Sequence, residues 1–170
     1  MTDIADPTRS RLVSWDDPMA TAAGVAQRSG LDALRAMRAG EVPPPPIARL
    51  LQMDVREVEE GRIVFACDLD ESVYNPLGVV HGGLVCALLD TVLGCATHTT
   101  LPQGWGYTSI ELKVSYLRPV TMAGGPLAAT GRVVKPGRRV AFAEGDVTDA
   151  SGRAVATATS SLLVFELPTG

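Results

Sequence analysis

The sequence predicts an α+β fold in which a curved antiparallel sheet of about six strands wraps around one central helix. The first observation is an apolar segment at 82–96, which has the length of a helix and apolar residues on nearly every face. Such a helix has to be enclosed on most sides. The second observation is that strand-like segments, divided by glycine and proline turn signals, lie on both sides of it in the chain. A strongly curved sheet is the economical way to enclose it.

The first 46 residues differ from the rest, and we expect an N-terminal helical extension with a proline spacer at 1–46 and one domain at 47–170. A first helix is predicted near residue 20. A second helix follows Ser29, a candidate N-cap with Asp32 three residues further on. The four prolines at 43–46 are then extended and form a stiff spacer.

Six strands are predicted in the second part of the chain, at 53–58, 62–69, 108–117, 127–134, 140–147 and 154–167. Glu60 and Gly61 join the first two strands as a hairpin, and the apolar helix is inserted between the second and the third. This order describes the hotdog architecture. A single protomer leaves an edge strand and part of the helix uncovered, so we expect protomers to pair.

The composition excludes several classes of partner. A chain of 170 residues has room for one domain and a terminal extension. Its net charge of −4 and its aromatic content of 5% argue against nucleic acid or an anionic membrane surface as the main partner. A membrane span needs about 20 apolar residues, whereas the segment at 82–96 is shorter and carries Asp90 in its middle. We therefore expect no nucleic-acid partner and no membrane.

The three cysteines, Cys67, Cys86 and Cys95, are widely spaced and lack a C-x-x-C pair, which argues against a disulfide framework. Only His81 and His98 could add to them as zinc ligands, so no metal site is expected. The first ten residues are polar and acidic, unlike a signal peptide. These observations favour a cytoplasmic protein with reduced thiols.

The residues that point to chemistry run from Asn75 to Gly83, N-P-L-G-V-V-H-G-G, and include Asp90. A helix that begins with glycine presents free N–H groups and the positive end of its dipole, where a carbonyl oxygen or an oxyanion can bind. Asp90, a lone carboxylate among leucines and valines, has to be desolvated, paired or functional. A carboxylate of this kind can activate water or attack as a nucleophile. The alternatives are structural: a turn at Asn75, a capping His81 and a hydrogen-bonded Asp90.

The spacing of Gly82 and Asp90 adds a constraint. They are eight residues apart, about 12 Å along one helix, and cannot easily reach the same carbonyl carbon within one chain. If both act, the glycine comes from one protomer and the aspartate from its partner. The sequence thus predicts a shared site at a two-fold interface, with two sites per dimer.

The pattern N-P-x-G-x-x-H-G-G-x-x-x-x-L-x-D, with the later strand G-Y-T-S-I-E-L-K-V-S-Y-L-R-P, resembles that of the hotdog acyl-CoA thioesterases of the phenylacetic-acid-degradation type. The resemblance runs over about residues 43–165. It implies hydrolysis of an acyl-CoA to free acid and coenzyme A, with no cofactor other than the coenzyme A of the substrate. It also implies a homo-oligomer, either a dimer or a dimer of dimers (a homotetramer).

Carried over by position, the resemblance implies a role for five residues. Gly82 N–H polarises the thioester carbonyl, and Asn75 assists as a second donor. His81 orients Asn75 and its loop. Asp90 of the partner subunit activates water or attacks directly. Ser109 falls where family members often carry a hydroxyl that positions water.

Strand alternation bears on the place of Ser109. Strict alternation puts Ile110 and Leu112 on the face that covers the helix, and Ser109 on the other face. Ser109 then reaches a site made with a partner, unless the alternation breaks near the start of the strand. Thr91, next to the aspartate, is the alternative hydroxyl.

Four residues are further candidates for substrate contact: Gly83, Thr91, Arg138 and Arg139. The two arginines belong to a turn that carries four of the 15 basic residues within eight positions, together with Arg132 and Lys135. The planar fork of arginine suits the phosphates of coenzyme A. The alternative is a solvated hairpin whose charges serve solubility.

Two other functions remain open at this level. A non-catalytic acyl-CoA-binding module would bind the thioester without releasing thiol. A hotdog dehydratase or hydratase is less favoured, because His81 falls several residues too late for the motif of those enzymes. The acyl group is not specified, although the small residues Ala87, Gly94 and Ala96 can leave room for an aryl or medium-length acyl group.

Overall fold

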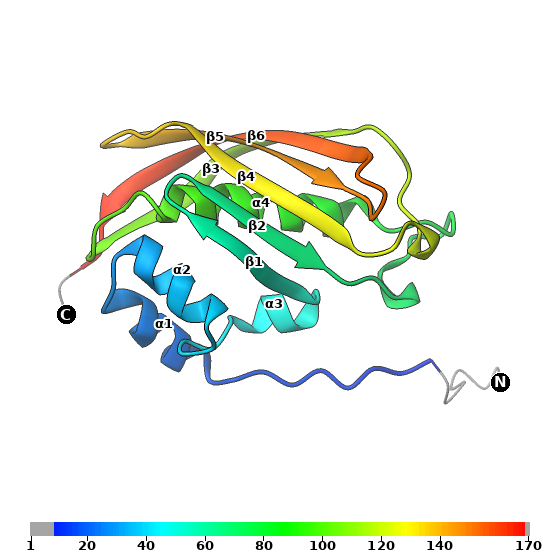
Figure 1. Cartoon of the computed structure of the whole chain (residues 1–170), viewed down its shortest axis with the longest axis horizontal. Coiled ribbons are helices and arrows are strands. Elements are labelled where there is room, and N and C mark those ends of the chain that lie inside the picture. Colours follow the sequence, from blue (N-terminus) through cyan, green and yellow to red (C-terminus); the bar gives the residue numbers. More distant parts are fainter. Residues whose placement is uncertain (1–8, 169–170) are drawn as a thin grey trace.

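The computed structural model of the chain describes residues 9–168, so the acidic start at 1–8 lies outside it. Among these residues, six strands form one antiparallel sheet in the order β1-β2-β4-β5-β6-β3. The strands are β1 (Met53–Glu59), β2 (Arg62–Cys67), β3 (Trp105–Tyr116), β4 (Leu127–Lys135), β5 (Val140–Thr148) and β6 (Ala154–Glu166). Figure 1 shows this sheet curving around one long helix, α4 (Gly82–His98). The predicted α+β hotdog fold is confirmed.

The helix α4 is held against the sheet by a row of side chains with no solvent exposure, namely Leu88, Leu89, Val92 and Leu93. Full burial of such a side chain contributes about 1.5–3 kcal/mol relative to leaving it exposed. Glycine lets β4 pass very close to the helix, since a Cβ at Gly131 would lie 2.2 Å from the Val92 carbonyl oxygen. The enclosure that the sequence predicts therefore exists on the sheet side of α4.

One side of α4 stays uncovered. Gly83 and Asp90 are exposed there, and Ala87 and Thr91 are half-buried. These four positions follow the spacing of one helix face, and we call them the open strip of α4. Because the two edge strands of the sheet are β1 and β3, the open strip faces the gap that the curved sheet leaves between its ends.

The hairpin predicted at Glu60 and Gly61 is confirmed, with β1 and β2 paired from Glu59 opposite Arg62. Gly61 has a φ of +73°, a left-handed conformation that glycine adopts without steric cost. Two short 3-10 turns, η1 (Glu71–Val73) and η2 (Met122–Gly124), complete the domain. Of these, η1 lies directly before the loop that leads into α4.

Three helices precede the sheet: α1 (Pro18–Ala26), α2 (Gly30–Arg38) and α3 (Pro46–Leu50). The predicted cap of α2 is confirmed, because the Ser29 hydroxyl oxygen accepts a 3.2 Å hydrogen bond from Asp32 N–H. The expectation that all four prolines are extended is wrong for the last one. Pro46 begins α3, where the missing N–H of proline costs no helical hydrogen bond.

Among the N-terminal helices, α2 packs against β1 and the end of α4, α3 packs against β1, and α1 packs on α2 (Figure 1). Leu34 of α2 is buried in the same hydrophobic core as the leucines of α4. Gly30 donates a 3.0 Å hydrogen bond to the Leu101 carbonyl, and a Cβ at Gly30 would lie 1.8 Å from the His98 carbonyl oxygen. The division of the chain at residue 46 stays a prediction, but the core is continuous across it.

No helix of residues 9–168 is long and apolar enough to cross a membrane.

Candidate active site

The loop before α4 is built around Asn75. Its side-chain oxygen accepts hydrogen bonds from the N–H groups of Leu77 (2.9 Å) and Val79 (3.4 Å), and its own N–H donates to the Val79 carbonyl at 2.8 Å. Gly78 closes the turn with a φ of +76°. The side-chain oxygen is thus used within the loop, which leaves the amide NH₂ as the end of Asn75 available to a ligand.

His81 caps α4. Its Nδ1 accepts a 2.8 Å hydrogen bond from Gly83 N–H, which satisfies one of the free donors of the first turn. Its backbone N–H donates to the Val73 carbonyl at 2.8 Å. Within the described part of the chain, no hydrogen bond joins the imidazole to Asn75. The side chain therefore fixes the start of the helix, and its backbone ties this start to η1.

Gly82 is the first residue of α4, and its N–H donates no hydrogen bond to any residue from 9 to 168. Its carbonyl accepts a 3.0 Å hydrogen bond from the Tyr116 hydroxyl, at the end of β3. Burial, and to a smaller extent the nearby Cys86, raises the pKa of Tyr116, so the hydroxyl keeps its proton and remains a donor. A Cβ at Gly82 would lie 3.3 Å from the Tyr116 ring, so a glycine fits this position best.

Gly82 and Tyr116 also line a groove of about 300 Å³ with Val80 and Val120. No sequence pattern singles out Tyr116, because in a strand a tyrosine at this place looks like any other partly exposed residue. Only the approach of β3 to the start of α4 gives it a role. An unpaired N–H at the positive end of a helix beside an open groove can hold the oxygen of a carbonyl group.

Asp90 lies in the middle of the open strip, and Ser109 of β3 donates a 2.7 Å hydrogen bond to its Oδ1. Asp90 is exposed in the single chain, so of the alternatives that the sequence leaves open the structure shows a paired carboxylate rather than a desolvated one. The apolar residues Leu88, Leu89, Val92 and Leu93 turn toward the sheet, while Asp90 itself turns toward the gap. The structure thus pairs the carboxylate with the hydroxyl predicted to lie near it.

The pairing depends on a β-bulge. Ser109 is opposite Leu162 and Glu111 is opposite Ser161, so Ile110 has no partner in β6 and is 56% exposed. An extra residue of this kind reverses the alternation of a strand. Strict alternation, which places Ile110 over the helix and Ser109 away from it, is therefore wrong at this position. After the bulge, Leu112 packs against the core.

The close approach of β3 to α4 is set by Gly94. A Cβ there would lie 2.5 Å from the Tyr107 ring, which fills the space that the missing side chain leaves. Burial raises the pKa of Tyr107 well above its usual value and that of the adjoining Cys95 to about 12, so both stay neutral. The room expected for an acyl group at Gly94 is taken by Tyr107, and Ala96 is fully buried in the core.

Thr91 follows Asp90 but turns its hydroxyl to the helix, donating to the Ala87 carbonyl at 2.8 Å. Together with Cys95 it lines a cavity of about 340 Å³ between α4, β1, α2 and α3. The other walls are largely apolar and include Leu34 and Phe65. The hydroxyl that contacts Asp90 is therefore that of Ser109, whereas Thr91 borders a cavity.

The hairpin of β4 and β5, which carries the basic residues predicted to contact phosphate, lies away from Gly82 and Asn75 within one chain. Arg132 pairs with Asp146 at 2.9 Å on the sheet surface. Arg138 and Arg139 are exposed and form no ion pair with residues 9–168. Arg138 lines a cavity of about 400 Å³ with Leu101, next to the C-terminal end of α4. Gly82 stands at the other end of this helix.

The site residues therefore form two groups, with Asn75 and Gly82 at the start of α4 and Asp90 and Ser109 about two turns further on. Their convergence across a two-fold axis stays a prediction. Within the described residues, no three His, Cys, Asp or Glu side chains lie close enough together to hold a metal ion.

Comparisons with known proteins relate this chain to thioesterases and esterases. A family model described as Thioesterase superfamily matches residues 77–156, a range that contains Gly82, Asp90 and Ser109. A Halobacterium salinarum protein with the provisional name of an esterase is 34% identical over 126 residues, which cover 68% of this chain and 82% of that protein. Acyl-coenzyme A thioesterase 13 of Homo sapiens is 29% identical over 97 residues, covering 56% of this chain and 68% of that protein. A solved structure, a phenylacetic acid degradation-related protein of Ralstonia eutropha, is similar with a TM-score of 0.71 and 31% identity, over 76% of this chain and 98% of that one.

Proposed function

Because the chain belongs to the thioesterase superfamily, we propose that this thioester hydrolase acts on acyl-coenzyme A and releases a free acid and coenzyme A. The relative from Homo sapiens, named an acyl-coenzyme A thioesterase, supports this substrate class. The observation that carries the proposal is the hydrogen bond from Ser109 to Asp90, on a helix whose first residue, Gly82, keeps an unpaired N–H. These are the parts needed to polarise a carbonyl and to activate its attacker.

The electrophilic half of the site consists of Gly82 N–H and the amide NH₂ of Asn75. Both groups donate hydrogen bonds to the carbonyl oxygen of the thioester, and the helix dipole adds to the stabilisation of negative charge on that oxygen. The hydrogen bond from Tyr116 to the Gly82 carbonyl supports the orientation of this peptide unit. The role fits a glycine, since a side chain would press on Tyr116.

The nucleophilic half consists of Asp90 and Ser109. As a base, Asp90 takes a proton from water while the water oxygen bonds to the carbonyl carbon; the C–S bond then breaks and the thiolate leaves. As a nucleophile, the carboxylate attacks the carbonyl carbon itself, the C–S bond breaks and the coenzyme A thiolate leaves; water later hydrolyses the mixed anhydride, which releases the acid and restores the Asp90 carboxylate. In both routes Ser109 holds one carboxylate oxygen and leaves the other for the reaction.

The two halves come from different protomers in this proposal. Gly82 and Asp90 are about 12 Å apart along α4, too far for one carbonyl group. A two-fold axis near the open strip would bring Asp90 of the partner subunit to the Gly82 of the first chain. The exposed edge β3 and the open strip are the surfaces such a dimer would cover. Arg138 and Arg139 are then candidates for the coenzyme A phosphates.

The cavity beside Thr91 is the proposed place of the acyl group. It begins one residue from Asp90, and its walls are largely apolar. An aryl or medium-length acyl chain would be stabilised there, because transfer of its apolar surface out of water is favourable. The N-terminal helices, which form part of its walls, would then influence which acyl groups are accepted.

The test is a panel of aryl, short, medium and long acyl-CoAs, with thiol release followed spectroscopically. Asp90→Asn should lose at least about 100-fold in kcat, the order that a general base contributes, at an unchanged melting temperature. Glu60→Gln, which removes an exposed carboxylate in the turn between β1 and β2, is the matched control. Full turnover by Asp90→Asn would overturn the role of Asp90. Tight acyl-CoA binding without thiol release would instead support the binding-module alternative.

A further inference from the structure

An extended segment at 9–17, here called the strap, precedes α1. It contains no helix or strand and runs beside α3 (Figure 1). Within the strap, the side chain of Arg11 reaches the end of α3 and the residue before η1. Arg9 also pairs with Glu71 at 2.9 Å, but both of these side chains are more than half exposed.

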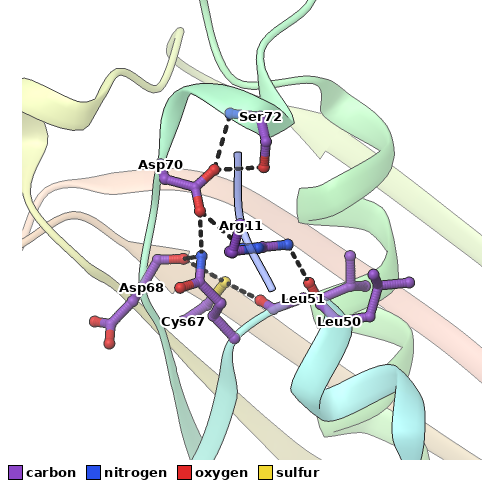
Figure 2. A network of polar contacts seen from close by, with 8 residues as sticks. Arg11, Leu50, Leu51, Cys67, Asp68, Asp70 and Ser72 are labelled. Carbon is purple, nitrogen blue, oxygen red and sulfur yellow. Dashed lines mark hydrogen bonds and ion pairs between the residues drawn. The ribbon is translucent and has the colours of Figure 1, made fainter. Parts of the chain in front are cut away.

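Arg11 uses both arms of its guanidinium group (Figure 2). One nitrogen donates to Asp70 Oδ2 at 2.8 Å, and the other donates to the Leu50 carbonyl at 2.8 Å. The Arg11 and Asp70 side chains are 28% and 33% exposed, so water screens this ion pair less than it screens most surface pairs. The planar fork of the guanidinium group suits two acceptors that lie on different parts of the chain.

Asp70 is the centre of the network in Figure 2. Its Oδ1 accepts hydrogen bonds from the Ser72 N–H at 2.8 Å and from the Ser72 hydroxyl, which caps η1. Its Oδ2 also accepts a 3.0 Å hydrogen bond from Gln52. The Ser72 hydroxyl, followed by smaller contributions that include Arg11, lowers the pKa of Asp70, so the charge that Arg11 binds persists at neutral pH.

From η1 the contacts lead directly to the electrophilic half of the site. The carbonyl of Val73, the last residue of η1, accepts the His81 N–H at 2.8 Å, immediately before Gly82. Tyr74 forms a β-bridge with Val80, and its hydroxyl accepts a hydrogen bond from Met122 N–H at 2.9 Å. Asn75 follows in the chain. Both carbonyl-binding donors are thus attached to a turn that Arg11 holds.

We infer that Arg11 is a positioning residue for the reaction, which fixes the loop of Asn75 and the start of α4 through Asp70 without touching the substrate. The inference rests on the proposed function for its kinetic consequence, since it assumes that Asn75 and Gly82 bind the carbonyl oxygen. It also assigns a role to the N-terminal segment, whose helices otherwise pack beside β1.

The kinetic test compares Arg11→Ala, Arg11→Lys and Asp16→Ala. Asp16 pairs with Arg49 at 3.8 Å and holds the other end of the strap, so its loss controls for a general loosening. Arg11→Ala should lower kcat about tenfold, the order for loss of charge-assisted hydrogen bonds, with KM changed less. Arg11→Lys should be intermediate, and added guanidinium ion should restore part of the kcat of Arg11→Ala. Asp16→Ala should keep its kcat.

A second readout does not depend on activity. Hydrogen–deuterium exchange of residues 70–83 should become faster in Arg11→Ala and stay unchanged in Asp16→Ala. Unchanged exchange in Arg11→Ala, or equal loss of kcat in Arg11→Ala and Asp16→Ala, would overturn the inference. Absence of thiol release by the unaltered chain would overturn the proposed function, and the exchange experiment would still decide whether Arg11 holds the loop.

Discussion

The Ser109 hydroxyl donates a 2.7 Å hydrogen bond to Asp90 Oδ1 within the same chain. The bond joins an edge strand to the central helix, and it exists because the bulge at Ile110 turns Ser109 toward α4. It leaves the second carboxylate oxygen without a hydrogen bond to any described residue. One oxygen is thus held while the other remains open to a ligand or to water.

Ser109→Ala should lower kcat about 10- to 100-fold, because a hydrogen bond to a charged group is worth about 1.5–3 kcal/mol. Steady-state kinetics on the best acyl-CoA measure this loss. Ser115→Ala, at an exposed position of the same strand, should behave like the unaltered enzyme. Equal activity of the two variants would show that the Ser109 bond has no part in the reaction.

Two inactive variants should restore activity when they share a dimer. Asn75→Ala removes the second carbonyl donor, and Asp90→Asn removes the base or nucleophile. Random mixing gives half hybrid dimers, each with one intact shared site, so about a quarter of the full activity should return. The measurement is thiol release after co-expression or joint refolding. No recovery in hybrids isolated by two different tags would contradict a site shared between subunits.

Gly94→Ala should reduce both stability and kcat. The added methyl group would lie 2.5 Å from the Tyr107 ring, and such overpacking costs about 1–3 kcal/mol. Because Tyr107 is two residues before Ser109, its displacement should also weaken the contact with Asp90. Thermal unfolding and kcat are the measurements.

The control for this change is Gly124→Ala, where the nearest atom to the new Cβ is 3.7 Å away, an ordinary contact. Combining Gly94→Ala with Tyr107→Leu should return part of the lost stability, since the smaller side chain makes room. If Gly94→Ala alone unfolds at the same temperature as the unaltered chain, the close approach of β3 and α4 does not depend on this glycine.

His98→Phe should stabilise the fold and flatten its dependence on pH. Both ring nitrogens of His98 are buried and lack a hydrogen-bond partner within residues 9–168, and the ring lies 5.6 Å from that of Tyr107. Because buried polar groups without a partner destabilise the fold, removing these two nitrogens should raise the free energy of unfolding by about 1–3 kcal/mol at neutral pH. Burial lowers the pKa of His98.

The sign of the pH effect follows from this direction. The unfolded chain binds a proton at His98 below about pH 6.5, while the folded chain does so only at lower pH. The stability that neutral His98 provides is therefore present above pH 6.5 and is lost as the pH falls toward the folded value. Urea unfolding between pH 7.5 and 5.5 should show a steeper loss in the unaltered chain than in His98→Phe. Parallel curves would contradict this account.

Much of the fold could be predicted from sequence because its signals are local. The all-face apolar helix, the turn at Gly61 and the Ser29 cap each depend on a few neighbouring residues, and each is confirmed. The helix α3 is missed because proline at the first position of a helix looks like the end of an extended run. From sequence alone, Pro46 fits equally the end of the extended proline run and the first residue of a helix, and only its packing distinguishes the two.

The candidate site was harder to predict where it depends on distant contacts. The residues of α4 and its loop follow from the motif, and the contact between Asp90 and Ser109 is present. Yet the bulge that makes this contact leaves no mark in the alternation of β3. Tyr116 at Gly82 and Arg11 at Asp70 each join segments far apart in the chain, and no spacing rule connects them.

The bulge at Ile110 has a consequence for how this chain tolerates change. Before the bulge, Tyr107 and Ser109 face the helix. After the bulge, Leu112 and Val114 pack against the core, at positions that are shifted by one residue from regular alternation. Loss of Ile110 itself would restore regular alternation and leave Ser109 and Leu112 on the same face, but it would remove the extra local twist that a bulge gives a strand. Loss of one residue elsewhere in β3 would instead move the side chains beyond it to the opposite face of the sheet.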